Sequence, residues 1–202
     1  MLDPGSPVRR YYEELAKNLL SVVEGAKSIV VTSPEPGAGC TSVCLGLGAA
    51  LADMGSRAAV VDCNLGNPQL HRMLGEPNFV GLTSSLRGDK GLEHYGHEVV
   101  QGLLVVPTGP VPSDPALLET RRFVEVVRGL EDGRDAVILD APVAGSVLRS
   151  SSLSNSFDGV LLVVHASRTP KSVARATTDD LLDAGINLLG VVLNGASLRV
   201  RS

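Results

Sequence analysis

Short aliphatic runs alternate with longer amphipathic stretches along this chain. The runs rich in β-branched residues predict six buried strands, at Ser28–Ser33, Ala58–Asp62, Leu103–Pro107, Ala136–Asp140, Gly159–His165 and Leu188–Asn194. The stretches beside them predict helices, at Val8–Glu24, Thr41–Met54, Pro68–Leu74, Gly81–Arg87, Ala116–Leu130 and Lys171–Ala184. Strands that alternate with helices favour right-handed crossovers. The pattern therefore predicts an α/β fold, with a mostly parallel central sheet and helices on both faces in three layers.

The length of 202 residues suits one domain with a sizeable core, so we expect a single domain over residues 1–202. Residues 8–24 form an N-terminal packing or assembly helix within it. Apolar residues make up 44% of the chain and charged residues 20%, a composition typical of globular proteins. No internal repeat interrupts the pattern, and the Pro-rich segment Gly109–Pro115 is too short for an interdomain linker.

Charge and composition narrow the classes of function. The formal net charge of -4 and the low aromatic content of 3% argue against an intrinsic nucleic-acid binder, which usually carries a basic stripe. The apolar runs are far shorter than the roughly 20 residues needed to cross a bilayer. Residues 1–10 lack the apolar stretch of a signal peptide. Three cysteines do not suggest a disulfide framework, so we expect a reducing cytoplasm.

The strand–turn–helix segment SPEPGAGCTS carries the most specific local signal. In a phosphate loop, glycines let backbone N–H groups surround phosphates at a helix N-terminus. A Lys then reaches the terminal phosphates and a Ser or Thr holds Mg²⁺. Gly37 and Gly39 supply the turn here, Thr41 stands at the metal-binding hydroxyl, and Cys40 occupies the Lys position. The alternative interpretation is an ordinary tight turn between a strand and a helix.

Two aspartates close predicted strands at the sheet edge where ligands bind in such folds. Asp62 ends the second strand and Asp140 ends the fourth. A carboxylate that faces a phosphate loop is suited to hold Mg²⁺ or its waters. The alternative for each is a turn or helix-capping Asp, but the occurrence of both favours a metal site.

Together these motifs resemble the cytoplasmic domain of bacterial tyrosine kinases (BY-kinases), within the class of septum-site and chromosome-partitioning ATPases. The resemblance runs from about Tyr12 to Asn194 and rests on PEPGAGCTS, VVDCNLGNPQLHRMLG, GLTSSLRG, LLVVPTGPVPSDPALL, AVILDAP and GVVLNG. The segments Asn67–Gly75, Gly81–Gly88 and Gly109–Leu118 are more specific to the kinases than the loop is.

The resemblance implies a site for ATP or ADP with Mg²⁺. The nucleotide-binding residues would be Pro36, Gly37, Ala38, Gly39, Cys40, Thr41, Ser42 and, facing the adenine, Asn194. Thr41, Asp62 and Asp140 would hold the metal. Asp62 and Asp140 would also be the catalytic acids, with Asp62 helping to activate the attacking tyrosine.

Several family features are altered. The Lys is Cys40, the second Asp of a DxD pattern is Asn64, and the following Arg is Gly66. The family's Glu-x-x-Arg-x-x-Arg assembly pattern falls on Arg10, Glu13 and Ala16. The tyrosine-rich tail that the family phosphorylates is missing, and the tyrosines are Tyr11, Tyr12 and Tyr95.

These departures predict impaired catalysis with weak nucleotide binding retained. Losing a charge-assisted hydrogen bond to phosphate costs on the order of 1.5–3 kcal/mol of binding, and losing a donor aimed at transition-state charge costs roughly 10²–10³ in rate. We therefore favour a pseudokinase-like regulatory module of capsular or exopolysaccharide assembly. The alternatives are an active tyrosine kinase with a non-standard loop, and a partitioning-type ATPase switch.

The same resemblance suggests binding partners and a cellular location. A membrane polysaccharide co-polymerase or an active kinase homologue would be the partner, a homo-oligomer is a further expectation, and no nucleic acid is expected. The domain would be cytoplasmic, held peripherally at the inner face of the membrane through its partner.

Other polar residues give weaker signals. Arg168 and Lys171 follow the fifth strand and are candidates to replace the missing loop cation, although a solvated loop explains them as well. A thiol in the first turn of a helix predicts a lowered pKa and a reactive Cys40, whereas small buried hydrophobic positions explain Cys44 and Cys63 better. His94 and His97 are expected in a solvent-facing loop, His165 ends a strand, and His71 is expected in local packing.

Overall fold

The central strands are apolar on both faces, and this places them inside the molecule. The computed structural model describes residues 5–22, 28–111, 115–150, 153 and 156–196. Its seven-stranded sheet has the order β3-β4-β2-β5-β1-β6-β7. The strands are β1 Ser28–Thr32, β2 Ala58–Asp62, β3 His97–Val100, β4 Leu103–Val106, β5 Ala136–Asp140, β6 Gly159–His165 and β7 Leu188–Asn194. Neighbouring strands pair in parallel, except that β3 runs antiparallel to β4.

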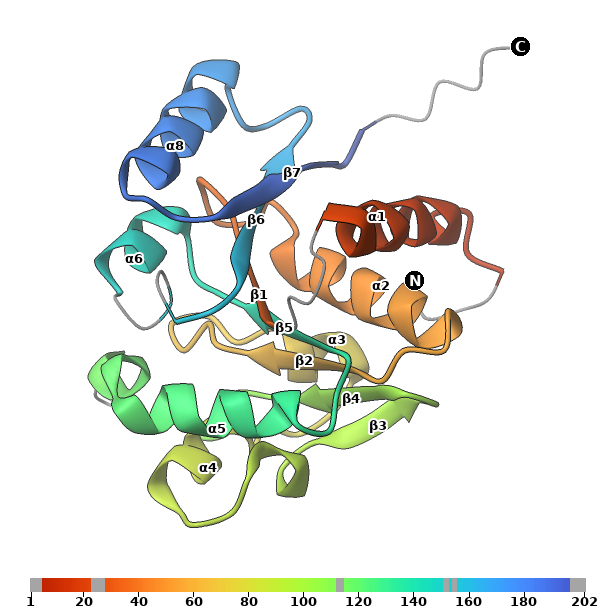
Figure 1. Ribbon diagram of the computed structural model, residues 1–202, viewed down its shortest axis with the longest axis vertical. Helices are drawn as coiled ribbons and strands as arrows, with labels where there is room; N and C mark the ends of the chain where they lie inside the picture. Colours follow the sequence, from red (N-terminus) through yellow and green to blue (C-terminus); the bar gives the residue numbers. More distant parts are fainter. Residues whose placement is uncertain (1–4, 23–27, 112–114, 151–152, 154–155, 197–202) are drawn as a thin grey trace.

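Helices cover both faces of the sheet (Figure 1). The helices are α1 Arg9–Val22, α2 Cys40–Asp53, α3 Leu70–Leu74, α4 Leu82–Arg87, α5 Arg121–Glu131, α6 Ala144–Arg149 and α8 Lys171–Asp183, with 3₁₀ turns η1 Leu92–His94 and η2 Pro115–Glu119. One hydrophobic core joins the sheet to α4, α5, α6 and α8, and a second joins it to α1, α2 and α3. Successive side chains of a strand point to opposite faces, so Val30 enters the first core and Val31 the second. The expected three-layer α/β fold is confirmed.

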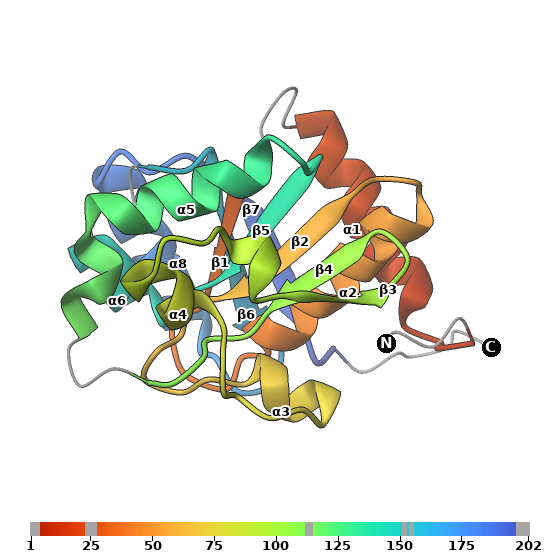
Figure 2. The ribbon, with the colours of Figure 1, turned by 90° about the horizontal axis from the view of Figure 1, so that it is seen from below.

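The sequence analysis missed one strand. Residues His97–Val100 form β3 at the sheet edge beside β4 (Figure 2), so the expectation that His97 lies in a polar loop was wrong. The edge position explains the error, because a strand half open to solvent needs no continuous apolar run. His97 Nε2 lies 2.8 Å from Glu76 Oε1. His94 is exposed at the end of η1, as expected for a solvent-facing histidine.

Two helix predictions also need correction. The helix expected over Ala116–Leu130 is divided into η2 and α5, because the Thr120 hydroxyl caps α5 by accepting a hydrogen bond from the Phe123 amide at 3.2 Å. Helix α6 was not predicted, since six residues give too little periodicity to detect. Glu24, which ended the helix expected over Val8–Glu24, lies outside the described residues.

The N-terminal helix packs directly on the helix that follows the phosphate loop. A side chain at Gly46 of α2 would overlap the Tyr12 ring, since an added Cβ would lie 2.4 Å from its Cζ atom. Ala16, one of the positions at which the resemblance would place a charged residue of the assembly pattern, is fully buried. Burial raises the pKa of the Tyr12 hydroxyl. Helix α1 is therefore part of the fold in this chain.

Within the described residues, no helix has both the length and the apolar character needed to cross a bilayer.

Candidate functional site

The turn between β1 and α2 has the backbone of a phosphate loop. Gly37 and Gly39 have φ values of 80° and 95°, in the left-handed region that favours glycine. A Cβ on Gly39 would lie 2.1 Å from Asn194 Nδ2, so the close approach of β7 also requires glycine there. Helix α2 starts at the next residue, Cys40. Both glycines thus serve the phosphate-loop shape predicted from the sequence.

A cavity of about 450 Å³ opens over this loop. All the predicted loop residues line it, together with residues from the ends of β1, β2 and β5: Ser33, Pro36, Gly37, Ala38, Gly39, Cys40, Thr41, Ser42, Asn64, Asn67, Gln69, Met73, Asp140, Ala141, Pro142 and Val143. Sequence reasoning did not select Gln69 or Met73. Both lie in Asn67–Gly75, the segment that the sequence analysis described as more specific to the kinases than the loop, and this was the available signal.

Thr41 and Asp140 form a hydrogen-bonded pair in this cavity. The Thr41 hydroxyl donates to Asp140 Oδ2 at 2.6 Å. The Asp140 side chain is nearly inaccessible, and burial raises its pKa to about 8; the nearby Asp62 carboxylate adds to this shift, while the Thr41 bond opposes it. The pair offers a hydroxyl and a carboxyl oxygen, which are the kind of ligand that Mg²⁺ prefers, and a bound cation would favour the ionised form of Asp140.

Asp62 lies opposite Asp140 on the neighbouring strand but is arranged differently. Its Oδ1 accepts from the Asn64 amide at 3.1 Å, and its Oδ2 accepts from the amides of Gln69 and Leu70 at 3.0 and 3.1 Å. Burial raises its pKa, and these bonds lower it. The side chain is fully buried, and Asp62 is not among the described residues that line the cavity. In this structure its carboxylate caps the turn into α3, so its catalytic and metal-binding roles stay predictions.

The Cys40 thiol was expected to be reactive, and the structure contradicts this expectation. Burial raises its pKa to about 12, and the Asp140 carboxylate adds to the increase, whereas a hydrogen bond with Ser33 opposes it. Cys44 and Cys63 are fully buried in the two cores, as expected for small hydrophobic positions. No cluster of three or more His, Cys, Asp or Glu side chains suited to a metal occurs in the described part of the chain.

Two side chains at the ends of β6 and β7 donate hydrogen bonds to carbonyl groups of the phosphate loop. Asn194, at the end of β7, donates from Nδ2 to the Ala38 carbonyl at 2.9 Å. Arg168, in the turn after β6, donates from Nη2 to the Gly37 carbonyl at 2.7 Å. The structure therefore brings Arg168 to the loop. The Lys171 side chain makes no hydrogen bond or ion pair within the described ranges.

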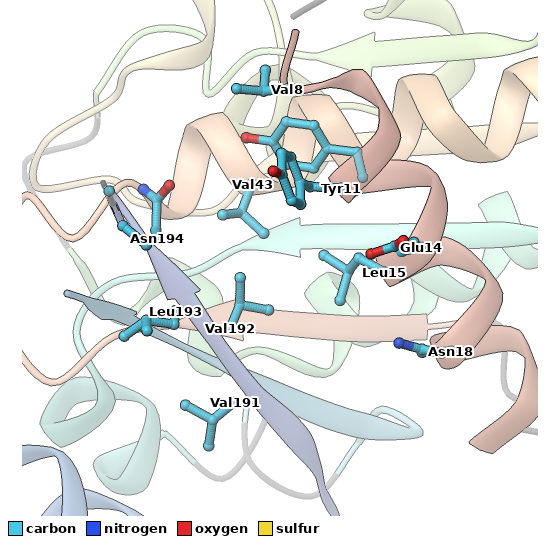
Figure 3. Close-up of a pocket in the computed structure, with 13 residues that line it drawn as sticks. Val8, Tyr11, Glu14, Leu15, Asn18, Val43, Val191, Val192, Leu193 and Asn194 are labelled. Atoms are coloured by element: carbon cyan, nitrogen blue, oxygen red, sulfur yellow. The ribbon is translucent and has the colours of Figure 1, made fainter. Parts of the chain in front are cut away.

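Asn194 also closes a groove between α1 and β7 (Figure 3). The groove has a volume of about 440 Å³, and its wall is largely apolar. Leu15 from α1, Val43 from α2 and Val192 from β7 face one another across it in Figure 3. Asn194 thus lines the groove and also contacts the phosphate loop at Ala38.

The residues present fit a Mg²⁺–nucleotide ligand in all but one respect. The glycine loop and the start of α2 offer backbone donors for phosphates, and the Thr41–Asp140 pair offers oxygens for the metal. None of the described residues that line the cavity is Lys or Arg. The missing element is a cation for the terminal phosphates.

Comparison with known proteins identifies the family. No family model matches the chain. The tyrosine-protein kinase YwqD of Bacillus subtilis is 30% identical over 210 residues, which cover 100% of this chain and 87% of YwqD. The chain belongs to the bacterial tyrosine-kinase family. The tyrosine-protein kinase CpsD of Streptococcus agalactiae is 27% identical over 93% of this chain and 82% of CpsD.

Solved structures place this BY-kinase-family domain among P-loop ATPases. The kinase domain of the Escherichia coli tyrosine kinase ETK superposes with a TM-score of 0.88 at 25% identity, over 98% of this chain and 80% of that one. The septum site-determining protein MinD of Pyrococcus horikoshii, solved with Mg-ADP, gives a TM-score of 0.68 at 27% identity, over 86% of this chain and 72% of MinD. The resemblance seen in the motifs is thus confirmed over the whole fold.

One relative shows a different chain length. The putative tyrosine-protein kinase EpsB of Ralstonia nicotianae is 33% identical over 172 residues, which are 84% of this chain but 23% of EpsB. The present sequence corresponds to a minor part of that protein.

Proposed function

We propose that this domain binds ATP or ADP with Mg²⁺ at the phosphate loop, transfers phosphate poorly, and acts as a regulatory module in capsular or exopolysaccharide assembly. The Thr41–Asp140 hydrogen bond at 2.6 Å carries the proposal, because it sets the two metal-binding groups side by side over an intact glycine loop. The pathway is inferred from the BY-kinase relatives. A membrane co-polymerase or an active kinase homologue would be the partner.

Different residues would bind the phosphates, the nucleoside and the metal. Backbone N–H groups of Gly37–Ser42 would hold the phosphates, and the apolar groove beside Asn194 would hold the nucleoside. Thr41 and Asp140 would hold Mg²⁺, which supplies charge neutralisation at the phosphates when bound. Asp62 would act behind them by fixing the turn that carries Asn64 and Gln69.

Weak phosphoryl transfer is expected because neutral residues stand at two charged positions of the site. Phosphoryl transfer depends on positioning and on charge stabilisation. Cys40 is neutral where a Lys would act, and Asn64 is neutral where the family has a second Asp. The Cys40 thiol, with a pKa of about 12, supplies no charge at neutral pH. Nucleotide binding through the backbone remains available.

Isothermal titration with ATP and ADP in the presence of MgCl₂ tests the proposal. We expect measurable binding that is weakened when Mg²⁺ is removed, and little or no turnover. Gly39→Ala should abolish binding, since its Cβ would overlap Asn194, whereas Gly133→Ala, with open space around it, should not. Micromolar ATP affinity combined with multiple turnover would refute the impaired-site proposal.

An active tyrosine kinase is the alternative that one observation favours. Arg168 places a guanidinium on the loop that lacks its Lys. Incubation with Mg-ATP followed by anti-phosphotyrosine detection distinguishes the two. A signal that Asp140→Asn removes would establish the kinase.

A further inference from the structure

The outer side of the phosphate loop carries a cation in a defined position. Arg168 Nη2 donates to the Gly37 carbonyl at 2.7 Å, and its Nη1 would lie 3.7 Å from a Cβ placed on Gly37. The turn that carries Arg168 is itself ordered by hydrogen bonds. The Arg168 amide donates to the His165 carbonyl, and the Thr169 hydroxyl accepts from the His165 amide at 3.2 Å.

The Arg168 guanidinium has more N–H donors than its contact with Gly37 uses. Arginine has five N–H donors in a fixed planar arrangement that matches phosphate oxygens. The contact with Gly37 uses one of them, and no carboxylate pairs with Arg168 anywhere in the described part of the chain. The side chain is exposed, and Arg168 is not among the described residues that line the cavity, so its contact with the site is through the Gly37 carbonyl. A bound polyphosphate would therefore meet an arginine whose charge is not already neutralised.

The cavity itself lacks such a charge. Its lining includes the Asp140 carboxylate and neutral residues, with Cys40 where a cation is needed. The cavity lining therefore offers no positive side chain to a polyphosphate, whose own negative charges favour nearby metal and protein cations. Of the two candidates from the sequence, Arg168 touches the loop, whereas Lys171 makes no contact with it that the described ranges show.

We propose that Arg168 supplies the positive charge for the terminal phosphates of the nucleotide, in place of a Lys at position 40. Its Nη2 stays on the Gly37 carbonyl, and its remaining donors take phosphate oxygens. This inference rests on the proposed nucleotide binding. It makes Arg168 a ligand-binding residue that selects for phosphate number.

Titration calorimetry with ATP, ADP and AMP, each with MgCl₂, tests the role of Arg168. Arg168→Gln keeps a donor for the Gly37 carbonyl but removes the charge, and we expect it to weaken ATP binding by about tenfold, the effect of one charge-assisted hydrogen bond at its lower limit. AMP binding should change by less than about twofold, because AMP has no terminal phosphates for this charge to reach. Arg168→Lys should retain most of the ATP preference.

Arg175→Gln is the matched control, because it removes the same charge from α8 and its side chain has no hydrogen bond or ion pair in the described ranges. If Arg168→Gln and Arg175→Gln bind ATP equally well, Arg168 has no such role, although nucleotide binding by the wild type would stand. Equal losses for ATP and AMP would also overturn the inference, because they would show that Arg168 only shapes the loop. No ATP binding by the wild type would overturn both proposals.

A double variant sharpens the result. If a Lys at position 40 does the same work, Arg168→Gln should cost less ATP affinity in the Cys40→Lys background than in the wild type. Strictly additive effects would contradict the replacement.

Discussion

The ends of β2 and β5 carry the same residue in the same register, yet the two aspartates have different surroundings. Both side chains are buried. Asp62 accepts three backbone amide hydrogen bonds, whereas Asp140 accepts one bond from Thr41 and lines the cavity. Burial raises the pKa of both. The comparison teaches that a strand-tip Asp holds a turn when amides surround it, and is available to a ligand when a hydroxyl and open space face it.

Asp62→Ala should produce the largest effect, on stability. Three amides would lose their acceptor, and unsatisfied buried donors cost about 1–3 kcal/mol each, so we expect the free energy of unfolding to fall by about 3 kcal/mol. Urea unfolding measures it. Asp62→Asn, which keeps one carbonyl oxygen, is the control and should lose less. A variant as stable as wild type that no longer binds Mg-ATP would show instead that Asp62 is a ligand-binding residue.

Cys40→Lys should act on the Asp140 side of the comparison. A Lys at the loop would add a charge-assisted hydrogen bond to phosphate, so ATP affinity should increase about tenfold or more. Its charge beside Asp140 should also lower the pKa of that carboxyl. Cys44→Ser, one turn along α2 in the core, is the control for loss of a thiol and should not increase affinity. An unchanged ATP affinity in Cys40→Lys would show that position 40 does not face the phosphates.

The pH dependence of the free energy of unfolding tests the raised pKa of Asp140. Burial raises the pKa of Asp140 from 3.8 to about 8, so the folded state favours the protonated form. Its contribution to stability is fully present below pH 3.8 and is lost as the pH rises through about 8. We expect a loss of at least about 1.4 kcal/mol over this window, the value of one pKa unit.

Urea unfolding at several pH values from 4 to 8.5 checks this prediction. In Asp140→Asn the part of the slope due to this group should disappear, because the amide does not titrate. Mg-ATP binding by the wild type should strengthen over the same window, since the metal prefers the ionised carboxylate. A variant with the same pH slope as the wild type would contradict the assignment.

Alkylation of Cys40 should give the smallest effect. With a pKa of about 12, its thiol has almost no thiolate at neutral pH. Mass spectrometry after brief iodoacetamide treatment should find little label on Cys40 in the native protein, and full label in urea. Preferential native labelling would show that the loop opens.

Much of this arrangement could be predicted from the sequence. β2, β5, β6 and β7 have the predicted bounds. β2, β5 and β6 are buried as predicted, because apolar runs suit the interior of a parallel sheet. The prediction that β7 is buried was wrong, because it lies at the sheet edge and Val191 and Leu193 are exposed. The phosphate loop was predicted because Gly37 and Gly39 are the residues that a left-handed turn requires. Strand β3 was missed, since its half-exposed sequence lacks an uninterrupted apolar run.

The side-chain environments could not be predicted. Asp62 and Asp140 each end a β-branched strand in the sequence, and their different hydrogen-bond partners could not be predicted. The amides of Gln69 and Leu70, seven and eight residues away, are bound to Asp62. The Thr41 hydroxyl, 99 residues away, is bound to Asp140. The thiol of Cys40 was expected to respond to the helix N-terminus, but burial next to Asp140 outweighs that effect. The contact of Arg168 with Gly37 joins residues 131 positions apart, which no local pattern specifies.

The packing of Tyr12 on Gly46 has a practical consequence for spectroscopy. The chain has no tryptophan and three tyrosines, so its intrinsic fluorescence comes from tyrosine alone. One of the three emitters rests on α2, the helix that begins at the phosphate loop. Tyr12→Phe would remove that emitter while keeping the ring on Gly46. The difference between the fluorescence spectra of the wild type and Tyr12→Phe then reports on the α1–α2 contact without an added label.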